Sequence, residues 1–425
     1  MTAYAYAGAT ALPLRRPDRD TVQGFREWAA QRGTLERPSL LPRGEYENLP
    51  PGDRRRYDLR RRVINTNIDI LDTPMSAAVS KVIEDTVMNN ALDMSPGAKP
   101  GLMVNGGGAQ GKTATVCEVL ANFLEDWEQI HGLTRADASG NRRDAHEPVV
   151  YVRAPIKPTP KSLCTTILDA LGEPYLKSDT FPDLQRRVHR VLVDLGVRVL
   201  VIDDITRIKM HRFDDQDVLD LIRALMDSGA TLILIGVGVP KSGLLGEGFD
   251  VVVDEGDKEV HVPPGTTRLR RRANEDDAQT TQTQRRFKLL HQRNFRYGTK
   301  HERDEWLRML VGLSSQLRLY GNDEHALLAD GLPEYLFSRT GGVVGTLVHL
   351  VQDAATAAMA APDPVTGNEV MTKELFEEIT VDFAGEDGRV AEAGEVPIVP
   401  EHKPSRRGRP RSTVFDERAV EAPGA

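Results

Sequence analysis

Cysteine is nearly absent from this sequence. Only Cys117 and Cys164 occur among the 425 residues, and each lies in a stretch whose apolar residues follow helical spacing. Two separated cysteines argue against a disulfide framework and against a zinc site. Hydrophobic residues make up 40% of the chain, which is ample for a buried core, and the length suggests about two or three domains.

Long uncharged apolar runs are also missing, and the N-terminus lacks the apolar segment of a signal peptide. These absences give no support for a membrane-spanning or secreted protein, so we expect a cytoplasmic protein with no membrane partner. The formal net charge of −8 does not by itself indicate a nucleic-acid binder. Local basic clusters are therefore more informative than the overall charge.

A glycine-rich stretch at residues 104–113 organises the rest of the sequence. It reads Val-Asn-Gly-Gly-Gly-Ala-Gln-Gly-Lys-Thr and fits G-x-x-x-x-G-K-[ST], the Walker A loop of P-loop NTPases. An apolar run precedes it and helical spacing follows it. A strand, a glycine loop and a helix in this order aim backbone N–H groups at an anion. We therefore predict ATP binding by Gly106, Gly107, Gly108, Ala109, Gln110, Gly111, Lys112, Thr113 and Ala114.

An acidic pair downstream completes the predicted site. Lys112 would reach the β- and γ-phosphates, and Thr113 would offer its hydroxyl to Mg²⁺. The apolar run 197–202 ends in Asp203-Asp204, a Walker B pattern. A buried parallel strand would place Asp203 beside the phosphates, where it would hold Mg²⁺ directly or through water. Asp204 stands where many such enzymes have Glu as the water-activating base; because Asp is one methylene shorter, we expect slow hydrolysis.

Buried strands alternate with helices along the middle of the chain. Strands are predicted at 102–104, 149–152, 197–203 and 231–236, with a short fifth at 260–262. This alternation predicts a parallel sheet covered on both faces. The fold class is therefore α/β: a three-layer α/β/α P-loop NTPase domain of AAA+ type, followed by a small helical lid.

Changes in composition divide the chain into five predicted parts. These are an N-terminal arm (1–65), the AAA+ core (66–264), a flexible basic insertion (265–284), the helical lid (285–385) and a disordered tail (386–425). Basic clusters lie outside the core at 54–62, 268–272 and 406–411. The first two predict either solvated segments or contacts with DNA or a partner. The third contains Arg-Gly-Arg-Pro, which is either an AT-hook for the A·T minor groove or a generic basic tail.

Several details resemble the TniB/TnsC-type ATP-binding proteins that regulate transposition. They are Ile70-Leu-Asp-Thr-Pro74 ahead of the Walker A loop, Arg286-Phe287 at the predicted start of the lid, and Tyr335-Leu-Phe-Ser-Arg339-Thr-Gly-Gly-Val-Val-Gly345-Thr-Leu within it. The resemblance covers roughly residues 60–385. It implies an ATPase that assembles on double-stranded DNA as a ring or filament and links target DNA to a transposase or integrase. Hydrolysis would then take the assembly apart.

The same resemblance suggests a residue that acts between subunits. By position, Arg285 or Arg286 is similar to an arginine finger that acts on a neighbouring subunit's ATP, and we place Arg286 with Lys112 and Asp204 among the candidate catalytic residues. The alternative is a solvated arginine pair at the start of the lid.

Three departures from the family pattern leave other functions open. Asp204 replaces Glu, Gly236-Val237 stands where a polar sensor residue would often lie, and Gly345 and its neighbours offer no second-sensor arginine. Each departure bears on hydrolysis and none on nucleotide binding. One alternative is a nucleotide-switched scaffold, or a signalling or defence P-loop NTPase, with little turnover. Another is a helicase-loader-like ATPase, which differs mainly in its partner.

Overall fold

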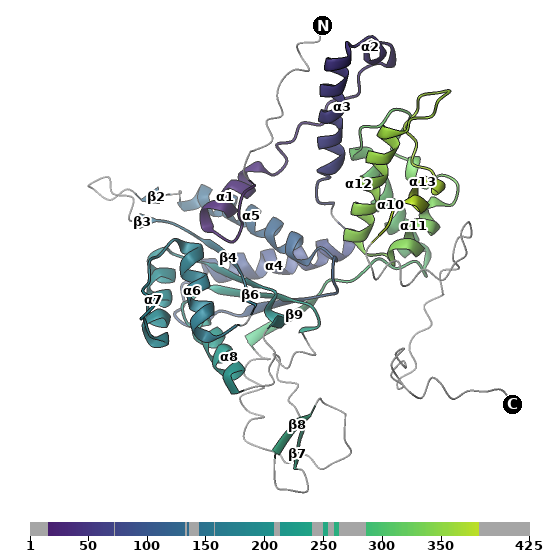
Figure 1. The fold of residues 1–425 in the computed structure, drawn as a ribbon. Coiled ribbons are helices and arrows are strands. Elements are labelled where there is room, and N and C mark those ends of the chain that lie inside the picture. The colour runs from purple at the N-terminus through teal and green to yellow at the C-terminus, as the bar shows by residue number, and fades with distance from the viewer. Residues whose placement is uncertain are drawn as a thin grey trace, which may run out of the picture.

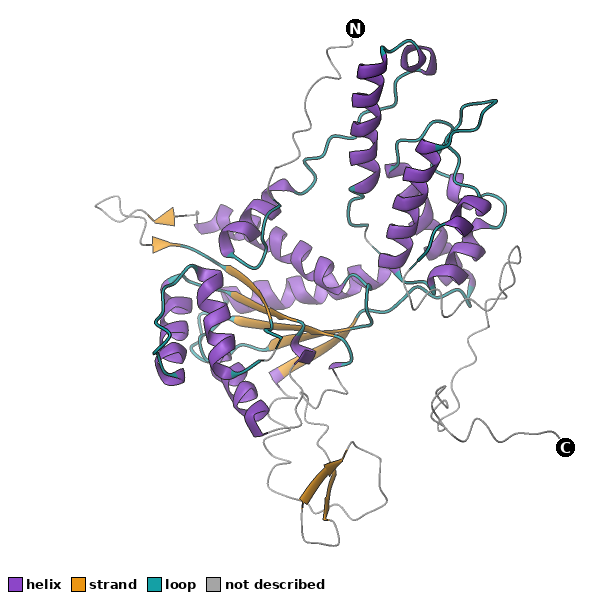
Figure 2. Cartoon of the chain, in the orientation of Figure 1, coloured by secondary structure: helices purple, strands orange, loops and turns teal. Residues whose placement is uncertain are grey.

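The computed structural model comprises an α/β core, a helical lid and an N-terminal helical segment that contacts both (Figures 1 and 2). The structure describes residues 16–71, 73–131, 134–135, 144–156, 158–207, 213–239, 250–253, 259–262 and 286–381. Three predicted features therefore lie outside the described residues: the insertion at 265–284, Arg285, and the tail at 386–425 with its AT-hook-like motif.

Five parallel strands form the central sheet, in the order β4-β5-β6-β1-β9. Their bounds are Gly101–Asn105 for β1, Val149–Arg153 for β4, Val199–Asp203 for β5, Thr231–Gly236 for β6 and Phe287–His291 for β9. The three central strands are almost wholly buried, as expected where helices cover both faces of a parallel sheet.

Helices cover the sheet on both sides (Figure 1). They are α4 (Pro74–Leu92), α5 (Lys112–His131), α6 (Pro160–Leu171), α7 (Phe181–Asp194) and α8 (Phe213–Met226). Val104 and Val201 share a buried cluster with α4 and α5, whereas Met103 and Ile202 share one with α6, α7 and α8. Successive strand residues thus face opposite layers. The predicted three-layer α/β/α architecture with a parallel sheet is confirmed.

The fifth strand of the sheet is not the one that the sequence predicted. Residues 260–262 belong to β8 (Glu259–Val262), which pairs antiparallel with β7 (Asp250–Val253) in a separate small sheet. The fifth strand is β9, which lies inside the range predicted as helical lid. It was hard to recognise because it is a short edge strand, Phe-Lys-Leu-Leu-His, with mixed exposure along its length. A second short antiparallel pair joins β2 (Thr134–Arg135) to β3 (Asp144–Ala145).

The lid has a hydrophobic core of its own around the buried Trp306. Its elements are α10 (Lys300–Gln316), the 3₁₀ turn η4 (Ala326–Leu328), α11 (Leu332–Thr340), α12 (Val344–Ala360) and α13 (Lys373–Glu378). Between α10 and α11 the chain forms the short turn η4. Asp330 and Gly331 have φ values of 49° and 72°, and such left-handed residues end regular helix before α11 begins.

The N-terminal segment is folded and contacts both other parts. It contains α1 (Val22–Gln31), α2 (Arg43–Glu47) and α3 (Pro51–Thr66). In α1, Phe25 is buried in the core cluster beside α5, and Arg26 pairs with Glu128 and Glu147. In Figure 1, α3 runs along the lid, away from the sheet.

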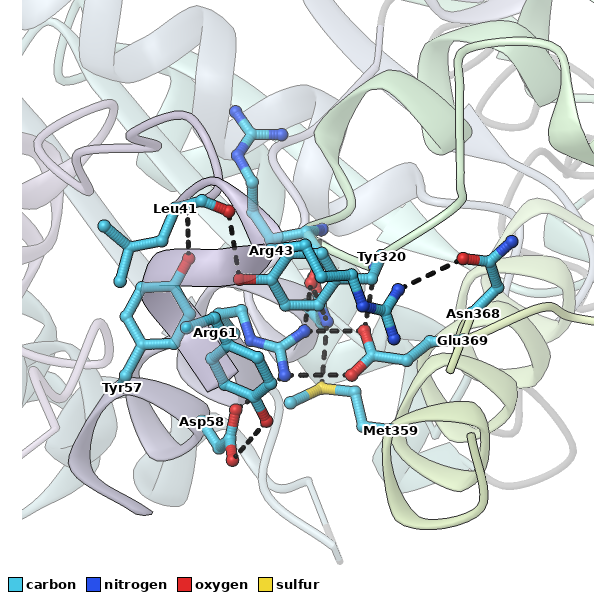
Figure 3. A network of polar contacts seen from close by, with 12 residues as sticks. Leu41, Arg43, Tyr57, Asp58, Arg61, Tyr320, Met359, Asn368 and Glu369 are labelled. Carbon is cyan, nitrogen blue, oxygen red and sulfur yellow. Dashed lines mark hydrogen bonds and ion pairs between the residues drawn. The ribbon is translucent and has the colours of Figure 1, made fainter. Parts of the chain in front are cut away.

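One arginine of the predicted basic cluster is buried between α3 and the lid (Figure 3). Arg61 is 3% exposed and donates to both carboxylate oxygens of Glu369, at 2.6 and 2.9 Å, and to Asp58 at 2.6 Å. Its guanidinium also lies 4.9 Å from the ring centroid of Tyr320. The sequence predicted a solvated segment or a contact with DNA or a partner here, whereas Arg61 pairs with Glu369 of the lid region within the same chain.

Two further observations bear on the predictions from composition. Both cysteines are buried and carry free thiols. Among the described residues, no helix combines the length and the apolar character that crossing a lipid bilayer requires.

Candidate functional site

The carboxyl ends of three neighbouring strands meet at one edge of the sheet because the strands are parallel. Asn105 at the end of β1 pairs with Gly236 at the end of β6, and β5 ends beside them at Asp203. The loop 106–111 leaves β1 at this edge and leads into α5 at Lys112. The predicted Walker A and Walker B residues therefore lie together, at the edge where open α/β sheets bind ligands.

The loop is a tight cradle of backbone groups. Gly111 has a φ of 81°, a left-handed conformation that favours glycine. A Cβ at Gly106 would lie 2.4 Å from Gln110 Oε1 and 2.8 Å from the carbonyl oxygen of Gln292. The same Gln110 oxygen accepts a hydrogen bond from the Gly107 N–H. Of the other predicted nucleotide contacts, Gly108 and Ala109 form an exposed turn and Ala114 lies in the first turn of α5.

Lys112 is the buried cation of this edge. Its side chain is 8% exposed, and Nζ donates to the carbonyl oxygen of Gly107. Burial lowers the pKa of Lys112, and the negative charges of Asp203 and Asp204 oppose that shift in part. Among the described residues no carboxylate lies within ion-pairing distance of Nζ. A buried ammonium without a paired carboxylate is suited to an anionic ligand.

Asp203 is held by three hydrogen bonds. Its Oδ2 accepts from Thr113 Oγ1 at 2.7 Å and from the Tyr151 hydroxyl at 2.7 Å. Its Oδ1 accepts from the Asp204 N–H at 2.7 Å. Burial raises the pKa of Tyr151, and the charge of Asp203 raises it further, so this hydroxyl remains a donor. The Walker B carboxylate is therefore fixed in orientation.

Thr113 and Asp203 are the residues that could hold a metal ion. Hydroxyl and carboxylate oxygens are ligands that Mg²⁺ prefers. In the described part of the chain, no three His, Cys, Asp or Glu side chains gather into a metal-binding group. A cation beside Thr113 and Asp203 would thus take its other ligands from water and from a phosphate-bearing ligand, as Mg²⁺ commonly does.

Asp204 has a backbone conformation uncommon for a residue other than glycine. Its φ is 55°, a left-handed value that costs on the order of 1–3 kcal/mol and occurs most often at functional sites. Its N–H orients Asp203, and its charge acts on Lys112. The structure thus brings together Lys112, Thr113, Asp203 and Asp204.

Two of the departures noted in the sequence have steric causes. A Cβ at Gly236 would lie within 3.0 Å of methyl groups of Thr206, Ile205 and Val239, because the end of β6 packs on the 3₁₀ turn η2 (Ile205–Arg207). A Cβ at Gly345 would lie 2.6 Å from the Ala109 carbonyl oxygen, which accepts a hydrogen bond from the Gly345 N–H at 2.9 Å. Neither position has room for a sensor side chain.

A cavity of about 530 Å³ opens beside the loop. It is lined by Gly106, Gly107 and Gln110 of the loop and by the segment 292–296, which links β9 to the lid. Gln110 Nε2 donates to Asn294 Oδ1 across it. The volume is typical of small-molecule sites.

Arg286 lies at the opposite edge of the sheet from the loop. It directly precedes β9, whose first residue, Phe287, pairs with Gly101 at the start of β1. The loop begins after the last residue of β1, about 13 Å further along the strand direction. Arg286 is therefore not joined to the cluster around Lys112 in its own subunit.

Several residues of the site gave no recognisable signal in the sequence. Tyr151 occupies one position of an apolar strand, where nothing distinguishes its hydroxyl from a core aromatic ring. Asn105 ends a strand, as many polar residues do, yet its Oδ1 accepts from the Val239 N–H and its backbone oxygen accepts from the Gln292 N–H. Arg293 and Asn294 follow the unpredicted strand β9, so their place beside the loop could not be foreseen.

Residues 76–242 match the family described as bacterial TniB protein. This range contains the Walker A loop and the acidic pair, and the predicted resemblance to TniB-type proteins is confirmed over it. No curated protein sequence matches the chain.

Three solved structures illustrate the similarity in fold. The Aeropyrum pernix Orc1 protein in complex with DNA aligns at 14% identity and a TM-score of 0.47, covering 74% of this chain and 67% of that one. Cdc6p from Pyrobaculum aerophilum aligns at 13% identity and a TM-score of 0.43, covering 72% of this chain and 66% of that one. AMPPCP-bound DnaA from Aquifex aeolicus aligns at 13% identity and a TM-score of 0.32, covering 68% of this chain and 72% of that one.

Proposed function

We propose that this protein is a AAA+ ATPase that binds ATP with Mg²⁺, hydrolyses it slowly and assembles on double-stranded DNA. There it links target DNA to a transposase or integrase. The observation that carries the proposal is the meeting of Lys112, Thr113 and Asp203 beside the glycine loop, with 2.7 Å between Thr113 Oγ1 and Asp203 Oδ2. The match of residues 76–242 to the TniB family supports the part that concerns transposition.

The residues fit a triphosphate and its metal. The cradle at Gly106 accepts no side chain, so backbone N–H groups of the loop can approach phosphate oxygens closely. Lys112 supplies a buried positive charge that forms no ion pair with a described residue. Thr113 and Asp203 would hold Mg²⁺, which supplies charge neutralisation to the phosphates when bound.

Asp204 is the proposed base for the attacking water. Its N–H donates to the Asp203 carboxylate, and its own side chain is one methylene shorter than that of Glu. A base held too far from the water loses part of the roughly 10²–10⁴-fold that acid–base catalysis supplies. Slow turnover follows, and it suits a protein whose assembled, ATP-bound form must persist.

The position of Arg286 supports self-association. Because it lies at the far edge of the sheet from its own loop, it can act as an arginine finger only on a neighbouring subunit's nucleotide. A ring or filament in which each subunit presents this edge to the next one would give every ATP such an arginine.

The exposed face of α3 is the described surface that best fits a DNA duplex. The helix buries Tyr57, Arg61 and Ile64 against the rest of the molecule and exposes Arg55 and Arg62 on its outer side. These two arginines lie about 10 Å apart, two helical turns, and pair with no carboxylate among the described residues. Such unpaired cations contact phosphates and make binding salt-dependent.

The proposal is tested by measuring assembly of the full chain in the electron microscope and by sedimentation. Duplex DNA is present or absent, with ATP, ADP or no nucleotide. We expect filaments or rings only with DNA and ATP together, and none for Lys112→Ala. Assembly that ignores the nucleotide would refute the proposal.

The DNA surface has its own test. Replacing Arg55 and Arg62 together by Ala should weaken duplex binding and reduce the dependence of log K on log salt by about 2. The matched control replaces Arg186 and Arg190, two exposed arginines of α7. If both pairs have the same effect, α3 is not the duplex-binding surface.

A nucleotide-switched scaffold with little turnover is the second candidate. The steric exclusion of sensor side chains at Gly236 and Gly345 favours it. Phosphate release with and without duplex DNA separates the two: DNA-stimulated turnover supports the ATPase, whereas ATP-dependent assembly without measurable release supports the scaffold.

A further inference from the structure

We propose that Arg293 and Arg296, on the segment that links β9 to the lid, contact the terminal phosphate of the bound nucleoside triphosphate. They would thereby let the protein distinguish a triphosphate from a diphosphate. The inference rests on the proposed function, since it names residues that bind the ATP already placed at the loop. Neither arginine belongs to the predicted Walker motifs.

Both arginines line the cavity beside the phosphate loop. Gly106, Gly107 and Gln110 line the same cavity of about 530 Å³. Anything that extends from the loop into the cavity therefore lies beside these two arginines. Guanidinium donors recognise phosphate oxygens with high geometric specificity.

The backbone of the segment is held in place at both ends. The Gln292 N–H donates to the Asn105 carbonyl oxygen at 2.8 Å, where β1 runs into the loop, and the Phe295 N–H donates to the Gly342 carbonyl oxygen at 3.0 Å, in the lid. Phe295 itself is buried in the lid core. The two arginines flank Phe295 on a segment that joins the loop edge to the lid, so a phosphate bound by them would couple the lid to the nucleotide.

The charges of these arginines are not neutralised within the described part of the molecule. Both side chains are exposed, and neither makes an ion pair or a hydrogen bond with another described residue. Glu302, whose charge interacts weakly with Arg296, is already occupied as the cap of α10, where it accepts from the Thr299 N–H at 2.9 Å. Unpaired cations beside an anion-binding loop favour the ligand with more negative charge.

Two other positions near the loop cannot carry a side chain that would contact a phosphate. At the end of β6, position 236 has no space for a side chain, and at the start of α12, position 345 is equally blocked by the Ala109 carbonyl. Among the residues that line the cavity, Arg293 and Arg296 carry the positive charges. A triphosphate would meet these charges, whereas a diphosphate, lacking the terminal group, would meet them less.

The experiment compares the affinities of Mg²⁺ with a non-hydrolysable ATP analogue and of Mg²⁺ with ADP by calorimetry, on the full chain. The variants are Arg293→Gln, Arg296→Gln and the double substitution. Arg308→Gln is the matched control, because Arg308 is an exposed lid arginine away from the cavity. We expect each cavity variant to weaken the ATP analogue roughly tenfold and to leave ADP within about twofold, with the control unchanged for both ligands. Arg293→Lys should retain most of the preference, because the charge is kept.

Two results would overturn the inference. One is an equal loss of affinity for both ligands, which would place the arginines on a part that ATP and ADP share. The other is unchanged affinity for both. If the unaltered protein binds neither ligand, the proposed function itself fails, and that outcome is distinct from the two above.

Discussion

Arg61 and Lys112 are both buried cations, but their pKa values shift in opposite directions. Arg61 is 3% exposed and Lys112 is 8% exposed. Burial acts to lower the pKa of Arg61, but its hydrogen bonds to Glu369 and Asp58 outweigh this effect and leave the pKa raised. Burial lowers the pKa of Lys112, and the charges of Asp203 and Asp204 do not restore it. Arg61 is paired with carboxylates of the protein itself, whereas Lys112 forms no ion pair among the described residues.

This difference distinguishes a cation with a structural role from a cation suited to binding a ligand. A buried guanidinium whose donors are taken by carboxylates, as in Figure 3, holds two parts of the chain together and has no capacity for a partner. A buried ammonium bonded only to a loop carbonyl is destabilising on its own, and its retention makes sense if a ligand supplies the missing charge. Position in a basic cluster or in a motif is thus less informative than how the charge is compensated.

The largest expected effect concerns Arg61. Arg61→Ala leaves Glu369 buried without its partner, so the free energy of unfolding should fall by about 3–5 kcal/mol, while ATP affinity of the folded protein changes little. Denaturant unfolding measures the first quantity and calorimetry the second. Arg62→Ala, at an exposed neighbouring position, is the control and should stay within about 0.5 kcal/mol. Equal effects of the two substitutions would contradict a structural role for Arg61.

Lys112→Ala should weaken ATP binding without lowering the stability of the protein. ATP affinity should fall by about 100-fold, or about 3 kcal/mol, because the phosphates lose a buried counter-charge. Stability without nucleotide should not decrease, since removing a desolvated charge relieves a cost. Calorimetry and thermal unfolding on the same samples test both statements. Unchanged affinity would remove Lys112 from the binding site.

Asp204→Glu sharpens the account of slow turnover. A carboxylate that reaches one methylene further should raise the rate of phosphate release by up to about tenfold, with ATP affinity unchanged. The measurement is steady-state phosphate release with duplex DNA present. A rate equal to that of the unaltered protein would mean that the length of this side chain does not limit hydrolysis.

The smallest expected effect is a pH dependence. Because the pKa of Lys112 lies below its ordinary 10.5 in the folded state, the unfolded chain binds more protons between the two values. Stability without nucleotide should therefore rise with pH across that window, and ATP affinity should fall there as the lysine loses its proton. The difference in Tm between the protein and its Lys112→Met variant, followed from about pH 7 to about pH 10, tests this. A difference that is flat with pH would contradict the lowered pKa.

The sequence predicted the parts of the site that are local in the chain. A glycine loop, its Lys112 and its Thr113 are adjacent residues, and Asp203 follows a strand whose apolar run is unambiguous.

The parts that the sequence did not predict depend on contacts between distant residues. Arg61 and Glu369 are 308 positions apart, and nothing near either residue indicates the other. The strand β9 is an edge strand that is recognisable only through its pairing with β1. Because the sequence did not predict β9, it did not predict that Arg293 and Arg296, which follow this strand, line the cavity. From the sequence, Gly236 and Gly345 were departures that bear on hydrolysis, and the structure adds that a Cβ at either position would clash with its neighbours.

The most direct test of the central claim is an experimental structure of the full chain with Mg²⁺ and a non-hydrolysable ATP analogue. The account predicts the triphosphate against the backbone amides of residues 106–112, with Lys112 Nζ on its phosphates and the metal ion between Thr113 and Asp203. A nucleotide bound elsewhere, or a metal ion away from Thr113 and Asp203, would contradict it.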